Sequence, residues 1–101
     1  MPQEQAILTI SITSKLVNLH QRTLMLYEKA GLIAPHRTNT QRRLFSIKNI
    51  NQLQFIKHLT QKKGVNLNGV KLLLEAIDVC EENGIRLQRR LFPAFKLKKL
   101  I

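Results

Sequence analysis

Cysteine, tryptophan and acidic residues are scarce in this sequence. Among 101 residues there is one cysteine, Cys80, no tryptophan, and six Asp and Glu against 17 Lys and Arg. A lone cysteine excludes an internal disulfide and a zinc site built from paired cysteines. No apolar run approaches the roughly 20 residues that span a bilayer, and the opening MPQEQAIL lacks the pattern of a signal peptide. We therefore expect one small, soluble, basic domain in a reducing compartment, the cytoplasm.

Motifs of catalysis and of metal binding are also missing. There is no glycine-rich phosphate loop, no motif that pairs Ser or Cys with His, and only one acid between residues 5 and 74. His20, His36 and His58 are scattered, without cysteine or carboxylate companions at ligand spacing. We predict that the protein is not an enzyme and that it uses no metal or other cofactor.

The net charge of +11 is unevenly distributed along the chain. Residues 5–74 carry eleven bases and a single acid, Glu28, whereas residues 75–83 carry four acids and no base. Residues 84–101 add six further bases. This excess predicts attraction to a polyanion, with nucleic acid as the first candidate and an anionic membrane as the second.

The first third of the chain predicts two short helices joined by a tight turn. Residues 6–10 are β-prone, and Ser11 can cap a helix that ends at Asn18, a residue type that tolerates the left-handed conformation. A second helix over about 21–30 would end at Gly31. Together these elements are a candidate helix-turn-helix.

A polar loop rich in arginine follows the second helix. Residues 36–43 lie between two extended pieces, which predicts a wing, a β-hairpin whose arginines can grip phosphate oxygens. We expect Asn39 to adopt the positive φ that the turn needs. Ser46 should cap a third helix, over about 47–62, and Gly64 should end it.

Apolar residues then recur at alternating spacings of three and four, as in the seam of a coiled coil. The pattern predicts a dimerisation helix over 67–92, ended by Pro93, although Gly84 could break it earlier. The ladder consists of Val70, Leu73, Ile77, Cys80, Gly84, Leu87 and Leu91. Of these we assign Val70, Leu73, Ile77, Cys80 and Leu87 to the dimer contact.

Residues 7–75 resemble the DNA-binding domain of the MerR family of transcription regulators. The resemblance extends over Gly64–Val70, where the sequence is most similar to the HspR branch of that family. The matching motifs are Ile10-Ser11-Ile12, Thr23-Leu24, Tyr27-Glu28, Gly31-Leu32-Ile33, Pro35, Arg37-Thr38 and Arg43-Leu44-Phe45-Ser46. The resemblance implies a mainly α fold, a winged helix-turn-helix with a small β wing and a C-terminal dimerisation helix. It also implies a homodimer that reads a palindromic operator on double-stranded DNA, as a repressor associated with the nucleoid.

The resemblance also implies which residues contact DNA. The start of the second helix would reach base edges or nearby phosphates, and the wing arginines and a second basic loop would contact the backbone. The residues are Gln21, Arg22, Thr23, Tyr27, Arg37, Arg42, Arg43, Lys62, Lys63 and Asn66. The sequence departs from the family pattern at Met25, where the family has an arginine, and it lacks the usual glycine at the wing tip.

The predicted organisation is a DNA-binding domain over 1–66, a dimerisation helix over 67–92 and a basic apolar tail over 93–101. The tail could bind a chaperone such as DnaK as co-repressor, extend the dimer seam, or lie on a membrane surface. It is too short to enclose a pocket for a small molecule. Two other functions remain open, an accessory DNA-binding factor of the excisionase type and a basic protein associated with RNA or ribosomes.

Overall fold

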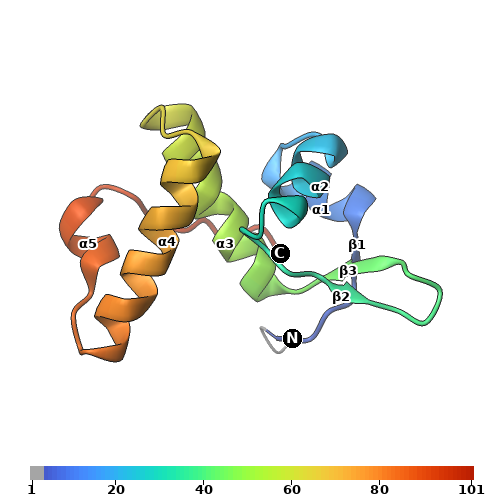
Figure 1. The fold of residues 1–101 in the computed structure, drawn as a ribbon. Coiled ribbons are helices and arrows are strands. Elements are labelled where there is room, and N and C mark those ends of the chain that lie inside the picture. Colours follow the sequence, from blue (N-terminus) through green and yellow to red (C-terminus); the bar gives the residue numbers. More distant parts are fainter. Residues whose placement is uncertain (1–3) are drawn as a thin grey trace.

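The computed structural model describes residues 4–101 as a mainly helical fold with one small sheet (Figure 1). The first three residues of the predicted DNA-binding domain lie outside this range. In chain order the elements are β1 (Leu8–Thr9), α1 (Ile10–Val17), α2 (Gln21–Lys29), β2 (His36–Arg37), β3 (Arg43–Phe45), α3 (Ile47–Lys57), the π-helical turn η1 (His58–Lys62), α4 (Leu67–Glu82) and α5 (Leu87–Leu91). This arrangement confirms the predicted fold class, a winged helix-turn-helix.

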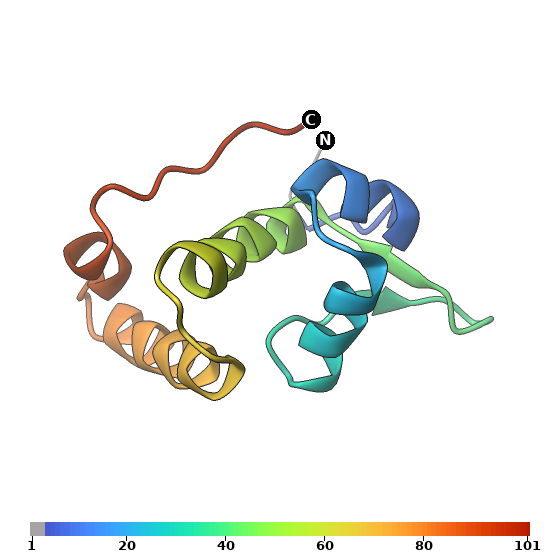
Figure 2. The same ribbon diagram turned by 90° about the horizontal axis from the view of Figure 1, so that it is seen from above.

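The sheet is antiparallel in the order β1-β3-β2. Leu8 pairs with Phe45, and His36 pairs with Leu44. The central strand β3 therefore joins the strand before the first helix to the hairpin that follows the second. The tip of the β2–β3 hairpin projects away from the helices (Figure 2).

Side-chain caps fix where the first helices begin. The hydroxyl of Thr9 accepts a hydrogen bond from the Ile12 N–H at 3.3 Å, so α1 begins before the expected cap, Ser11. Asn18 ends α1 with a φ of 55°, as predicted. At the next helix the Nδ1 of His20 accepts from the Arg22 N–H at 3.1 Å and caps α2.

The third helix supplies the centre of the hydrophobic core. Ser46 caps it, as expected, and Asn49 completes a reciprocal capping box. Leu53, Ile56 and Leu59 are wholly shielded from solvent. The α-helix is shorter than the predicted 47–62, because its last turn is the π-helical segment η1.

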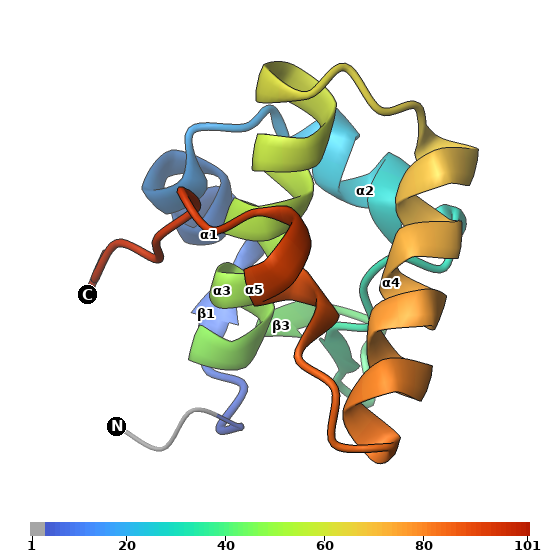
Figure 3. The same cartoon turned by 90° about the vertical axis from the view of Figure 1, so that its left-hand side faces the viewer.

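The continuous helix predicted over 67–92 is wrong, and the alternative break near Gly84 is correct. α4 ends at Glu82, and Gly84 takes a φ of 77°, in the left-handed region that glycine adopts without strain. The chain then turns into α5, which packs beside α4 (Figure 3).

The predicted dimer seam is also corrected in part. Val70 and Ile77 are 0% and 5% exposed and belong to the core of the chain itself, so in this conformation they cannot meet a second copy. Leu73 and Leu87 pack partly against the same core, and Cys80 is half-buried. The outer face of α4 instead exposes Leu72 and Val79. Within residues 4–101, no helix combines the length and the apolar composition needed to cross a membrane.

Candidate nucleic-acid interface

The start of α2 presents polar side chains to solvent. Arg22 is exposed, and Gln21 and Thr23 on either side of it are half-buried. Because the first N–H groups of a helix carry partial positive charge, this end of α2 suits an anion as well as a base edge. All three residues were predicted to contact DNA, and the structure places them together on one helical turn.

Tyr27 lies on the inner side of α2. The residue is only 4% exposed, and its hydroxyl is 3.5 Å from the hydroxyl of Thr60 in η1. The side chain therefore packs as a core residue that joins α2 to the end of α3. A contact between its hydroxyl and phosphate stays a prediction.

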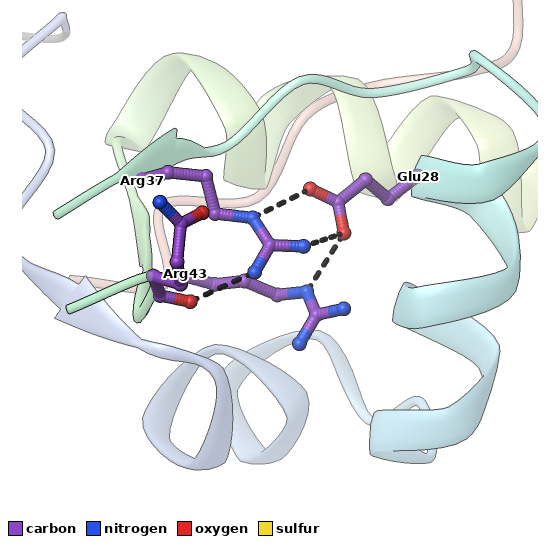
Figure 4. A network of polar contacts seen from close by, with 4 residues as sticks. Glu28, Arg37 and Arg43 are labelled. Carbon is purple, nitrogen blue, oxygen red and sulfur yellow. Dashed lines mark hydrogen bonds and ion pairs between the residues drawn. The ribbon is translucent and has the colours of Figure 1, made fainter. Parts of the chain in front are cut away.

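Two of the wing arginines turn back onto α2 (Figure 4). Arg37 donates from Nη2 to Oε1 of Glu28 at 3.0 Å and from Nε to Oε2 at 3.3 Å. Arg43 donates from Nε to Oε1 of the same carboxylate at 2.7 Å. A third donor of Arg37, Nη1, meets the carbonyl oxygen of Gln41 at 2.8 Å. One acid on the second helix thus fixes both strands of the hairpin.

The electrostatics of Glu28 follow from this geometry. Partial burial acts to raise the pKa of the Glu28 carboxyl, but hydrogen bonds and the charges of Arg43 and Arg37 outweigh it. The net result is a pKa of Glu28 below its ordinary value. Charge-assisted bonds of this kind are the stronger class of hydrogen bond, and only about a fifth of the Glu28 side chain is exposed, at 21%.

Glu28 is a residue of this interface to which the sequence assigned no role. Arg37 and Arg43 were predicted to meet phosphate, yet in the structure their first partner is this carboxylate. The signal was present in the sequence, because Glu28 is the only acid between residues 5 and 74. An isolated acid among eleven bases is expected to attract several of them.

The turn of the hairpin differs from the prediction at one residue. Gln41, and not Asn39, has the positive φ, at 64°. Its N–H donates to the Thr38 carbonyl at 2.9 Å, while its own carbonyl accepts from Arg37, so the two bonds fix its backbone. The turn leaves the side chain of Arg42 exposed at the tip.

A second basic loop runs from Lys62, the last residue of η1, to the start of α4. Lys62 and Lys63 are both exposed in it, as a backbone contact requires. Asn66 has a different first role, because its Oδ1 accepts from the Gly69 N–H at 2.8 Å and caps α4. Only the amide N–H groups of Asn66 remain to meet a phosphate.

A groove of about 600 Å³ lies between α3 and α4. Side chains of both signs line it, among them Lys48, Lys71, Glu75 and Asp78. It is open to solvent, unlike the enclosed apolar sites that hold small molecules. In the described part of the chain, no three His, Cys, Asp or Glu side chains gather closely enough to hold a metal ion.

Comparison with known proteins gives one consistent family. The profile of the "MerR HTH family regulatory protein" family matches residues 8–77. The "Putative heat shock protein HspR" of Streptomyces coelicolor is 33% identical over 75 residues, covering 74% of this chain and 50% of that protein. The "HTH-type transcriptional regulator GlnR" of Bacillus anthracis is 38% identical over 80 residues, covering 72% of this chain and 61% of that protein.

The matched region contains both β-hairpin strands, the two helices before them, α3 and most of α4. The chain spans between half and about three fifths of the length of these relatives. Family profile, relatives and the winged helix-turn-helix geometry agree with the resemblance found in the sequence. The chain belongs to the MerR family of helix-turn-helix regulatory proteins.

Proposed function

We propose that the protein is a DNA-binding transcription regulator, a repressor that binds a palindromic operator as a homodimer. In this proposal α2 enters the major groove and the β2–β3 hairpin lies on the backbone. The protein would act on the nucleoid in the cytoplasm, without catalytic activity or cofactor. The observation that carries the proposal is the contact of Glu28 with Arg37 and Arg43, which joins the two DNA-facing elements into one unit.

The exposed cations divide into two proposed roles. Arg22, on the first turn of α2, would reach base edges, where arginine reads guanine with two hydrogen bonds. Arg42 at the hairpin tip and Lys62 and Lys63 on the second basic loop would contact phosphates and set the register of the protein on the duplex. Arg37 and Arg43 would mainly position the hairpin.

The homodimer is supported by an apolar stripe on the outer face of α4. Leu72 and Val79, seven residues apart, are 68% and 58% exposed, and Ala76 between them is exposed as well. Spacings of four and three place these side chains on one side of the helix, where a second copy could cover them. A two-fold dimer would read a palindrome because its half-sites are related by the same symmetry. The proposal of a chaperone co-repressor rests on the resemblance to HspR alone, and no contact among residues 4–101 identifies a site for it.

Selection of bound duplexes from random DNA tests the proposal. We expect a palindromic consensus, and analytical ultracentrifugation of the complex should show two chains on each duplex. Even protection of all DNA, with no consensus, would overturn it.

Two single variants then separate base reading from phosphate binding. Arg22→Gln should lower the affinity for the consensus and relax the preference at one position of each half-site. Lys63→Gln should weaken binding to all sequences alike and reduce the salt slope by about 2, one unit for each chain of the dimer. Identical behaviour of the two variants would contradict the assignment of α2 as the reading helix.

A further inference from the structure

The chain beyond α5 doubles back and runs along α3. Figure 2 shows this segment, residues 92–101, extended beside the helix in the opposite direction. The segment carries three lysines and no acid. The sequence left its role open among a chaperone site, a dimer seam and a membrane contact.

A pair of amide hydrogen bonds fixes the middle of the segment. The side chain of Gln54 on α3 donates from Nε2 to the Lys98 carbonyl at 2.9 Å and accepts the Lys98 N–H at Oε1, also at 2.9 Å. The side chain thereby pairs with the backbone as a neighbouring strand would. Since both bonds use only the backbone of Lys98, its ammonium group is left to point elsewhere.

Aromatic contacts hold the beginning of the segment. The ring centroids of Phe92 and Phe95 lie 5.6 and 5.2 Å from that of Phe55, which is buried on α3. The ring of His58 lies 5.0 Å from that of Phe95. Leu100 near the other end packs partly against the core. Phe92, Phe95 and Leu100 are therefore engaged with the chain itself, whereas Leu97 and Ile101 are exposed.

Two of the three lysines of the segment line a basic groove. Lys96 and Lys98 line this groove of about 490 Å³, whereas Leu97 between them does not. Lys98 also borders a second hollow, together with Leu97 and Lys99. Lys57 and Lys62 line the basic groove from α3 and η1, and none of its described lining residues is acidic. The ammonium group of Lys57 donates to the Val17 carbonyl at 3.0 Å, so the groove continues to the end of α1, just before the turn into α2.

We propose that residues 92–101 are a docked part of the nucleic-acid interface, and that Lys96, Lys98 and Lys62 bind backbone phosphates of double-stranded DNA flanking the site that α2 reads. The position of the groove supports this, because it connects the turn before α2 to the second basic loop. Three ammonium groups without a carboxylate among them match the charge of successive phosphates. A membrane fits less well, since Phe92, Phe95 and Leu100 pack partly against the core, and the exposed Leu97 and Ile101 do not line the groove of Lys96 and Lys98.

This inference rests on the proposed function, and its test uses the full chain and the consensus duplex that the selection yields. One duplex carries a flank of about ten base pairs, one helical turn, on each side, and a second has no flanks. The variant is Lys96→Gln with Lys98→Gln. The control is Arg89→Gln with Arg90→Gln, which removes the same charge from exposed side chains on α5 that do not line the groove.

On the flanked duplex, the lysine variant should reduce the salt slope by about 3.6, the value for four phosphate contacts, two from each chain of the dimer. Between about 50 and 200 mM salt, the affinity of the unmodified chain should then fall about 150-fold more than that of the variant. The control should keep the original slope, and on the unflanked duplex all three proteins should agree. Thermal unfolding should be the same for all three, since only exposed charges change.

Equal slopes for the lysine variant and the control would overturn the proposal. The same holds if the lysine variant keeps its slope on DNA and loses binding to phosphatidylglycerol vesicles, which would make the segment a membrane contact. Gln54→Ala is a further test variant, because it frees the segment without removing charge. It should reproduce part of the reduction in the salt slope on the flanked duplex. If the selection returns no consensus at all, the proposed function itself has failed.

Discussion

The hairpin and the C-terminal segment are both short extended pieces of chain held against a helix, but by opposite means. The hairpin is attached to α2 through charge, with one carboxylate and two guanidinium groups. The C-terminal segment is attached to α3 through aromatic packing and a neutral amide pair. In the hairpin, two of the cations are used for attachment. In the C-terminal segment, the lysines remain available to bind an anion.

The number of basic residues in a segment therefore does not give the number of phosphates that the segment can bind. Residues 36–43 and 96–99 each carry three bases, yet only Arg42 of the hairpin is left without a carboxylate partner, whereas Lys96, Lys98 and Lys99 have none among the described residues. The segment that looks less like a DNA-binding element in the sequence therefore offers more unpaired charge. The following changes test each kind of attachment in turn.

Phe55→Ala should have the largest effect, because it removes the buried ring on which the C-terminal segment packs. We expect the free energy of unfolding to fall by about 3 to 5 kcal/mol, the usual cost for a buried phenylalanine. Urea denaturation measures it, and Leu97→Ala, at a half-exposed site, serves as the control. Equal losses in the two variants would mean that packing does not hold the segment.

Glu28→Gln should break the attachment of the hairpin while keeping the shape of the side chain. We expect a loss of about 1 to 2 kcal/mol in stability, because two ion pairs are replaced by contacts of guanidinium groups with a neutral amide. Arg37 and Arg43 would then be released, so the salt slope of binding to random duplexes should steepen while preference for the consensus falls. Glu75→Gln on α4 is the control, and an unchanged slope in Glu28→Gln would argue against the positioning role.

Gln41→Gly should strengthen the hairpin without touching its ion pairs. At a φ of 64° a side chain carries a steric cost that glycine avoids, so we expect a gain of about 1 kcal/mol. Asn39→Gly, two residues away, has no positive φ to relieve and should give no gain. Thermal unfolding of the two variants decides between these positions, and a gain at Asn39 would contradict the turn described above.

Acidification should weaken the attachment of the hairpin to α2 and leave the attachment of the C-terminal segment to α3 unchanged. Because the pKa of Glu28 is lower in the folded than in the unfolded chain, its stabilisation is complete above about pH 4.3 and is lost as the pH falls through the folded value. The difference in stability between the original chain and Glu28→Gln should therefore shrink in strong acid. The difference in stability between the original chain and Gln54→Ala should stay constant. We expect the effect of acidification to be the smallest of the four.

Local features of the fold could be predicted from the sequence because short-range physics decides them. The αL end at Asn18, the cap at Ser46 and the break at Gly84 each depend on one residue type and its neighbours. The start of α1 was misplaced because Thr9 and Ser11 can both cap, and pairing of β1 with β3 favours the earlier one.

Features that depend on long-range contacts were harder to predict. Val70 and Ile77 fit a coiled-coil seam by spacing, and only the folded chain shows that α3 and its neighbours bury them. The two wing arginines fit a phosphate contact by type, and only the approach of α2 to the hairpin reveals the carboxylate between them. The sequence thus indicates which residues carry charge or apolar surface, and the fold decides what each one meets.

The pairing of Gln54 with Lys98 also has a consequence for the order of folding. Glu28 meets partners 9 and 15 residues away, whereas Gln54 and Lys98 are separated by 44 residues. Closing the longer loop costs more chain entropy, so local contacts are favoured to form first. Helix α2 and the β2–β3 hairpin can therefore assemble while α3 still lacks its C-terminal cover. In such an order of folding the ring of Phe55 would be exposed until the segment docks, and exposed apolar surface of this kind favours aggregation.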